Sequence, residues 1–524
     1  MKKFFIILSS LVLITASNSC SDQELELYPV SQDDIEDINT EDKLQKFLNA
    51  GYLTVGSVSA FGTDAMAIAD VLSDNAYITS AKAYSLTYNM NYSALNNDTG
   101  GIYRSMYDAI MNCNTVINNT QVESNANVVR MKAEAKIIRA FCYFTLLNYF
   151  SPAPTSGINQ EYGVPLVLAD YDASIQPARA SVAEVYNQII ADLNAGVAEA
   201  NEIPAGPEEA SKVFLSKTAA KLILSRVYLT RRAAGDAELA LQYATDIVNM
   251  QNSPGSLFKP VAKNDYVAYF SGLPEEGAEN QNETIWELDM NDNSNLVTGV
   301  GSNLALPTLY NRVTTDRRAI LFTKDFFDSF PHTDLPTLSN GTPQSYSPDV
   351  RRGSTKTTTT SASQYPGVPT AVQPTGLLTT LTLPAVDNPA GAWTNKYPRL
   401  TSSGNFFRNI KIFRFAEAQL NRIEALFLTG QTATALAELN LFAISRGGST
   451  YTEASIQNIL TEKAKEFYGE GQRFYDLKRH NLPLVKGPNC VMNCNVPAND
   501  KLFVMPISQS ALNYNPNLKQ YPGY

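Results

Sequence analysis

Apolar residues recur every three or four positions through two long stretches of the chain, from about residue 41 to 250 and again from about 405 to 480. This spacing gives an α-helix one apolar face. Ser181 with Glu184 three residues later forms a capping box, which predicts a helix that begins at Val182. The apolar face of this helix consists of Val182, Val185, Tyr186, Ile189, Ile190 and Leu193.

Further helices follow with short connections. One carries Ala219, Leu222, Ile223 and Val227, and Gly235 separates it from the next, which carries Ala237, Leu241, Ala244 and Val248. Near the C-terminus, one face before Gly430 consists of Ile412, Phe415, Ala416, Leu420, Ile423 and Phe427, and a second helix runs from Thr434 to Arg446. Paired helices of about 34 residues are the unit of tetratricopeptide repeats. We therefore predict stacked helix pairs.

Between about residues 251 and 404 the periodicity gives way to Pro, Gly, Asn, Ser and Thr. Thr284–Leu288 is the clear strand candidate, and we expect Trp286 within it to be a core residue. The run Ser354–Thr360 is typical of a solvated loop. Because long structured loops in compact domains are often functional, we expect ligand contacts in this region.

These patterns predict a mainly α fold with a few short strands. A chain of 524 residues can bury a sizeable core. We expect a single domain over 41–524, with a helical scaffold at 41–250 and 405–480, a loop-rich region at 251–404 and a C-terminal segment at 481–524.

The N-terminal residues and the net charge indicate where the protein is located and which class of partner is not expected to bind it. Lys2 and Lys3, an apolar run from Phe4 to Ile14 and the single Cys20 predict a signal peptide over 1–19 and a lipidated, acidic tether over 20–40. Ordinary secretion, with Cys20 as a free thiol, is the alternative. The net charge of −10 with only two histidines argues against nucleic acid as a partner.

Four other cysteines are present. Cys113 and Cys142 lie in apolar helical patterns and are expected in the core. Cys490 and Cys494 lie four residues apart in an irregular stretch. The sequence is compatible with a local disulfide between them and with two free thiols. No additional His or Cys at ligand spacing favours zinc there.

Six elements, in order along the chain, resemble those of the SusD/RagB family. They are Ala133–Phe144 with Gly163–Leu166, Arg179–Leu193, Lys217–Leu229, Arg414–Asn440, Glu470–Arg479 and Asn515–Tyr524. Tyr103 stands where the family often has Trp. The resemblance implies a helical scaffold of tetratricopeptide-like pairs, a loop-built binding face and a TonB-dependent outer-membrane transporter as partner.

The charged residues of these elements have apolar neighbours within predicted helices. We expect partly buried ion pairs that fix helix register, in preference to ligand contacts. The residues are Arg139, Arg226, Arg414, Glu417, Arg473 and Asp476.

The sequence contains few of the residues and motifs that common enzyme mechanisms require. The histidines are His332 and His480, the latter at a helix end where a capping or surface role is expected, and neither G-x-S-x-G nor a P-loop occurs. Two carboxylates would suffice for a glycosidase, but the resemblance argues against one. Asp289–Asn295 resembles the start of a calcium-binding loop but lacks the Gly and Glu that such a loop requires. We therefore expect a solvated turn, with a weak Ca²⁺ site as the alternative. We expect no cofactor.

For a sugar ligand, aromatic faces and planar polar side chains are needed. Asp74 lies where the family tends to place a ligand-facing Asp, and the other candidates lie in the loops. The predicted ligand-binding set is Asp74, Asn75, Tyr77, Tyr84, Tyr88, Tyr92, Tyr310, Arg312 and Trp393. The leading hypothesis is a lipid-anchored glycan receptor on the extracellular face of the outer membrane. A RagB-like peptide receptor or adhesin is the alternative.

Overall fold

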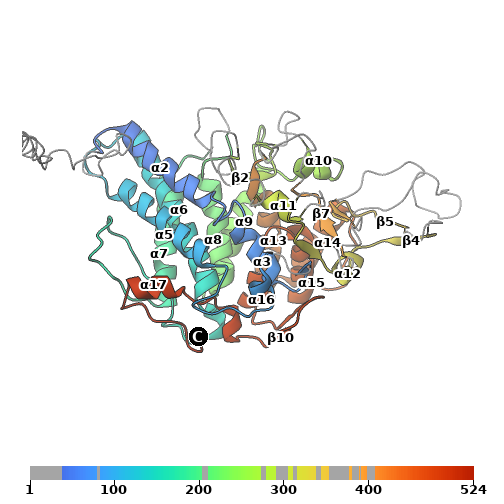
Figure 1. The fold of residues 1–524 in the computed structure, drawn as a ribbon. Helices are drawn as coiled ribbons and strands as arrows, with labels where there is room; N and C mark the ends of the chain where they lie inside the picture. Colours follow the sequence, from blue (N-terminus) through green and yellow to red (C-terminus); the bar gives the residue numbers. More distant parts are fainter. Residues whose placement is uncertain are drawn as a thin grey trace, which may run out of the picture.

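The computed structural model describes residues 38–79, 83–202, 211–272, 279–290, 305–310, 316–337, 344–352, 377–379, 389, 391–397 and 408–524. Two groups of long helices form the scaffold (Figure 1). The first comprises α2 (Glu41–Val55), α3 (Asp64–Leu72), α5 (Gly100–Asn118), α6 (Ala126–Phe150), α7 (Val182–Glu199), α8 (Lys217–Arg231) and α9 (Asp236–Met250). The second comprises α13 (Phe415–Leu428), α14 (Thr432–Arg446), α15 (Ile456–Phe467) and α16 (Arg473–Arg479).

Shorter elements connect and cover these groups. The short helices are α4 (Ser85–Tyr88), α10 (Tyr266–Ser271), α11 (Leu306–Tyr310), α12 (Lys324–Asp328) and α17 (Gln509–Tyr514). The strands form two-stranded antiparallel pairs: β1 (Ala76–Ile78) with β3 (Ile320–Phe322), β2 (Thr284–Leu288) with β8 (Ile410–Arg414), β4 (Thr333–Leu335) with β5 (Gln344–Tyr346), β6 (Leu378–Thr379) with β7 (Trp393–Thr394), and β9 (Leu484–Val485) with β10 (Asn495–Val496). The prediction of a mainly helical fold with a few short strands is confirmed.

The helices pack in chain order. Contacts join α5 to α6, α6 to α7, α7 to α8 and α8 to α9, and α9 then packs against α13 of the second group. Helix α6 is the centre of the first group, because nearly every side chain from Ala133 to Phe150 is buried. Helix α7 approaches it closely at Gly196, where a Cβ would lie only 2.4 Å from Cγ1 of Ile137. The main core runs from Ile38 to Leu518 and thus joins both groups.

Local sequence signals set several boundaries. Ser181 and Glu184 form the predicted capping box of α7, and Gly235, at φ +84°, precedes α9 as its N-cap. One assignment was wrong. Ile412 belongs to strand β8, and α13 begins at Phe415, because residues 410–414 pair with β2 before the chain turns into the helix. Trp286 is in the core, as predicted.

The charged residues of the family elements form the expected ion pairs. They are Arg139–Asp192 (2.7 Å), Arg226–Glu417 (2.6 Å), Arg414–Glu470 (2.8 Å), Arg473–Asp74 (2.8 Å) and Asp476–Arg479 (2.6 Å). Arg414 departs from the expectation in one respect, since it ends strand β8 and does not lie within a helix. His480 is the C-cap residue of α16, but its ring is buried, with Nε2 3.0 Å from Oε1 of Glu424.

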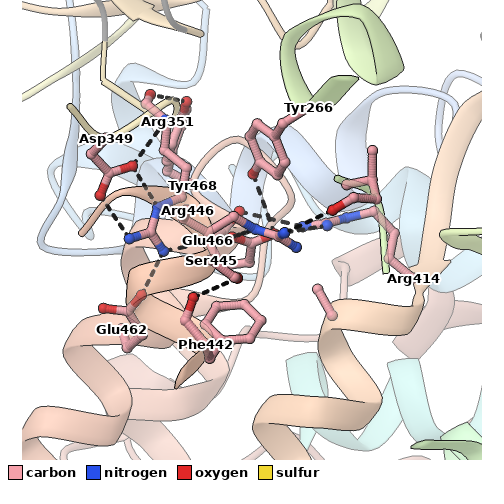
Figure 2. Close-up of polar contacts among 12 residues, drawn as sticks. Tyr266, Asp349, Arg351, Arg414, Phe442, Ser445, Arg446, Glu462, Glu466 and Tyr468 are labelled. Carbon is pink, nitrogen blue, oxygen red and sulfur yellow. Dashed lines mark hydrogen bonds and ion pairs between the residues drawn. The ribbon is translucent and has the colours of Figure 1, made fainter. Parts of the chain in front are cut away.

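A buried charge network fastens the loop-rich region, residues 251–404, to α15. Figure 2 shows Arg351, Arg414 and Arg446 converging on Glu466, and each of these side chains is at most 1% exposed. Arg351 also bonds Asp349 and Glu462 at 2.8 and 2.7 Å. Burial alone would raise the pKa of Glu466, but the surrounding cations hold it far below its ordinary value. The network therefore keeps Glu466 ionised in the core.

The cysteines divide into two kinds. Cys490 and Cys494 are joined by a disulfide, whereas Cys113 and Cys142 are free and buried in the helical core, as predicted. Across the described residues, no helix is both long and apolar enough to cross a bilayer.

Candidate functional site

Five chain segments meet around a surface hollow of ≈ 420 Å³, which we call the Asp74 hollow. Asp74 and Asn75 enter it from the turn between α3 and β1. Strand β3 pairs with β1, and Thr323 directly after β3 donates from its backbone N–H to the Asn75 carbonyl at 2.8 Å. The remaining walls come from α12, α15, α16 and the segment after β9.

Local capping positions α12 on the rim of the Asp74 hollow. The Thr323 hydroxyl accepts from the backbone N–H of Phe326 at 3.2 Å and so caps the N-terminus of α12. Phe326 is nearly buried, whereas Lys324 and Asp328 form an exposed pair one helical turn apart. The wall that α12 contributes therefore combines one apolar ring with solvated charge.

Arg473 of α16 holds the Asp74 carboxylate in a two-bond fork. Its Nε and Nη2 donate to Oδ1 and Oδ2 at 2.8 Å each. Burial alone would lower the pKa of Arg473, but the bonds to Asp74 and its charge raise that pKa above the ordinary value. The guanidinium is thus permanently charged, and the orientation of Asp74 is fixed from a residue 399 positions away in the sequence.

Two buried donors at the Asp74 hollow are left without an acceptor. Within the described part of the chain, Nδ2 of Asn75 and Nη1 of Arg473 are buried and form no hydrogen bond. Both residues line the hollow. A buried donor without an acceptor costs on the order of 1–3 kcal/mol, so such groups are rare in folded proteins unless a water or ligand satisfies them. Because both nitrogens are covered, an acceptor from outside the protein would reach them only after these side chains shift.

The segment Lys486–Pro488 closes one side of the Asp74 hollow. Nζ of Lys486 donates to the Val71 and Ser73 carbonyls at 2.6 and 3.3 Å, at the C-terminal end of α3. Burial lowers the pKa of Lys486 to about 7, although the charge of Asp74 opposes this shift. The Tyr88 hydroxyl donates to the Pro488 carbonyl at 2.5 Å and fixes the end of the segment.

The structure places the predicted ligand-binding residues in different surroundings. Asp74 and Asn75 line the Asp74 hollow. The rings of Tyr77, Tyr88 and Tyr310 are 0% exposed and that of Tyr92 is 6% exposed, so protein already covers their faces. Their hydroxyls donate to Pro389, Pro488, Asp70 and Leu502 respectively. A ligand could stack on these four rings only if the covering residues moved, and Tyr88 supports the wall of the hollow through its hydroxyl.

Two further predicted residues, Tyr84 and Trp393, lie elsewhere. Tyr84 is half-buried at φ +62°, donates to Asp64 Oδ1 at 2.7 Å and lies under the guanidinium of Arg317. Trp393 is half-buried in strand β7. Neither lines the Asp74 hollow. Arg312 lies outside the described residues.

Several lining residues were missed by the sequence reasoning. Arg473 was assigned to an ion pair only, and the loop-rich region gave no sign that Phe326 of α12 would face Asp74. Lys486 and Gly487 lie in the C-terminal segment, where no ligand contact was expected. The one available signal was the cationic Arg473 in a predicted helix, which needs a carboxylate partner when it is partly buried.

Among the described residues, no three His, Cys, Asp or Glu side chains form a group that could hold a metal ion. Most of the calcium-like loop, from Asn291 on, lies outside those residues. Around the Asp74 hollow, the described carboxylates are Asp74, already paired with Arg473, and Asp325. These carboxylate oxygens can accept hydrogen bonds from a polar organic ligand.

Comparisons with known proteins agree with this architecture. Residues 25–229 match a SusD-like family model described as "Starch-binding associating with outer membrane", and residues 351–524 match the SusD family model. A SusD-like protein of Bacteroides ovatus is 30% identical over 167 residues, which are 29% of this chain and 28% of that protein. The starch-binding protein SusD of Bacteroides thetaiotaomicron is 37% identical over 124 residues, 22% of each chain. The matched stretches thus span less than a third of either curated relative.

Solved structures resemble the whole described fold. A SusD superfamily protein of Bacteroides vulgatus has a TM-score of 0.74 at 20% identity, over 93% of this chain and 100% of that chain. The surface glycan-binding protein A of Bacteroides uniformis has a TM-score of 0.65 at 18% identity, over 92% and 99%.

Family models thus match both ends of a chain whose described part is a helical scaffold with a polar surface hollow. The chain belongs to the SusD/RagB family, a family of non-catalytic binding proteins.

Proposed function

We propose that this protein captures a carbohydrate, an oligo- or polysaccharide, in the Asp74 hollow and holds it without chemical change. The observation that carries the proposal is the pair of buried donors, Asn75 Nδ2 and Arg473 Nη1, that lack a protein acceptor beside the fixed Asp74 carboxylate. Sugar hydroxyls both donate and accept, so a neighbouring pair can accept from such donors and donate to a carboxylate.

The charges around the hollow favour a neutral ligand. The charge of Arg473 is balanced by Asp74, and Lys324 is paired with Asp328. The buried Nζ of Lys486 donates to backbone carbonyls that belong to α3 and the turn after it. A carboxylate or sulfate would therefore meet Asp74 without a free cation to compensate it. Hydroxyl, ring and carbonyl oxygens of an uncharged sugar fit the donors without this cost.

Location and delivery are part of the same proposal. The family descriptions name starch binding and association with the outer membrane. We infer that Cys20 carries a lipid anchor after removal of residues 1–19, that the protein faces the cell exterior, and that it passes its ligand to a TonB-dependent outer-membrane transporter. Replacement of Cys20 by Ser should move the protein from the outer-membrane fraction to the soluble fraction. Unchanged fractionation would contradict the anchor.

Isothermal titration of the mature protein against a panel of neutral and acidic oligosaccharides tests the binding site. We expect Asn75→Ala to weaken the binding of a neutral oligosaccharide about three- to tenfold, the loss of roughly one hydrogen bond. Asn187→Ala is the matched control, because Asn187 is an exposed residue of α7 outside the hollow.

Two results would oppose the proposal. Equal affinity of wild type and Asn75→Ala would remove the Asp74 hollow as the site. Binding heat with peptides, together with no binding heat with any sugar, would show that the ligand is a peptide. This is the alternative that the family resemblance leaves open.

A further inference from the structure

A second and larger hollow, of ≈ 900 Å³, lies between the start of α5, residues 165–177 and α17. We call it the Tyr514 hollow. It shares no lining residue with the Asp74 hollow. In Figure 1, α17 lies at the left of the molecule, whereas α12, on the rim of the Asp74 hollow, lies at the right. The two hollows are therefore separate places on the surface.

Three tyrosines give the Tyr514 hollow an aromatic lining. Tyr103 and Tyr107 lie one turn apart on α5 with ring centroids 4.8 Å apart, and both are half-buried. Tyr103 packs edge-on against Phe150, and the Tyr107 hydroxyl donates to the Pro165 carbonyl at 2.9 Å, so the two rings are fixed in place. Tyr514 at the end of α17 is 83% exposed. Its ring offers the open face that the core tyrosines lack.

Charged side chains of opposite sign stand beside these rings. Arg104 and Asp108 are exposed, line the hollow and lie one turn apart on α5. Neither makes a close hydrogen bond or ion pair with a side chain in the described ranges, although the charge of Arg104 acts on Asp108. A guanidinium and a carboxylate can each engage two neighbouring hydroxyls, the first as donor and the second as acceptor. Their charges cancel, so the site attracts neither anions nor cations.

We propose that the Tyr514 hollow is a second carbohydrate site, which takes part of a neutral glycan chain with one sugar ring on Tyr514 and hydroxyls on Arg104 and Asp108. Its volume is in the range of small-molecule sites, about 300–1,000 Å³. The combination of an open aromatic face with planar polar groups is the one that sugar recognition needs. A polymer that occupies both hollows dissociates more slowly than one held at a single site.

Native gel electrophoresis with polysaccharides in the gel tests this second site. The probes are soluble starch, pullulan, xylan, galactomannan and arabinan, and the variants are Tyr514→Ala, Arg104→Ala with Asp108→Ala, and Asn75→Ala. Tyr171→Ala is the matched control, because Tyr171 is 72% exposed and outside both hollows. Since Tyr514 is exposed, its removal leaves the core unchanged, and circular dichroism verifies the fold of each variant.

For the polysaccharide that retards the wild type, we expect Tyr514→Ala and the α5 double variant each to lower the affinity about two- to tenfold. Tyr171→Ala should have no effect, and Tyr514→Ala combined with Asn75→Ala should lower affinity more than either alone. Unchanged retardation in both Tyr514-hollow variants would overturn the second site and leave the proposed function intact. A loss confined to these variants, with Asn75→Ala unchanged, would support the second site and overturn the first. Retardation by no probe would overturn both.

Discussion

The side chains of Asn75 and Arg473 each keep one buried donor without an acceptor, which costs the unliganded protein stability. Such a cost is tolerated in binding sites, because the ligand supplies the missing partner. A residue that serves the fold alone would show the opposite behaviour, since its removal would destabilise the protein.

This difference gives a prediction for Asn75→Ala. The substitution removes a buried, unpaired Nδ2 and keeps the backbone bond from Thr323, so we expect the free energy of unfolding to rise by about 1 kcal/mol while sugar affinity falls. Urea unfolding monitored by circular dichroism measures the first effect. A destabilised variant would assign Asn75 to the scaffold.

Asp70 carries a second residue-level prediction, on pH. Burial raises its pKa from 3.8 to about 7, although the Tyr310 hydroxyl and the Gly471 N–H bond the carboxylate. Between pH 4 and 7 the Asp70 carboxyl is therefore protonated in the folded state and ionised in the unfolded state. The contribution of Asp70 to the free energy of unfolding thus falls as the pH rises through this window.

Asp70→Asn removes this titration. We expect the free energy of unfolding of the variant, relative to wild type, to rise by roughly 4 kcal/mol from pH 4 to pH 8. Urea titrations at a series of pH values measure the difference. Parallel pH profiles for the two proteins would show that Asp70 has an ordinary pKa in the folded state.

At the scale of elements, Glu466 of α15 pairs with Arg351 of the loop-rich region, Arg414 of β8 and Arg446 of α14. These pairs connect the loop-rich region to the helices. Glu466→Gln would leave three buried cations with one anion fewer. We expect a loss of about 3–5 kcal/mol in the free energy of unfolding. Glu438→Gln is the control, because its pair with Arg422 is partly exposed and should contribute under about 1 kcal/mol. Equal losses in the two variants would contradict the role given to the network.

The disulfide between Cys490 and Cys494 closes a short loop directly after the Lys486–Pro488 wall. Side chains of Asn489 and Asn493 donate to the carbonyls of Ile78 and Met90, so this loop is tied to the segment around β1 and α4.

Replacement of both cysteines by Ser should lower the free energy of unfolding by roughly 2 kcal/mol and also weaken sugar binding, because the wall loses its constraint. Calorimetric unfolding and titration measure the two effects. An unchanged sugar affinity with lowered stability would show that the disulfide serves the fold alone.

For the molecule as a whole, the periodic helices could be predicted from the sequence, because an apolar face such as Val182–Leu193 needs only local information. The strand at Thr284–Leu288 was found for the same reason. Ile412 was misassigned because its strand forms only through pairing with β2, more than a hundred residues away.

The site was harder to predict than the fold. Asp74 was chosen through the family resemblance, with Asn75 and Tyr77 because they follow the same helix, whereas Tyr88 and Tyr310 were chosen because loop tyrosines suit sugar binding. Sequence cannot distinguish a loop tyrosine whose ring faces water from one whose hydroxyl reaches a buried partner, as Tyr310 reaches Asp70. The Asp74–Arg473 contact joins residues 399 positions apart, and no local pattern indicates it.

The most direct test of the account is a crystal structure of the protein with the oligosaccharide that binds best in titration. We expect a sugar in the Asp74 hollow with an oxygen within hydrogen-bond distance of Asn75 Nδ2 and of Arg473 Nη1, and an intact glycan chain. A ligand bound elsewhere, with both nitrogens still unpaired, would contradict the central claim.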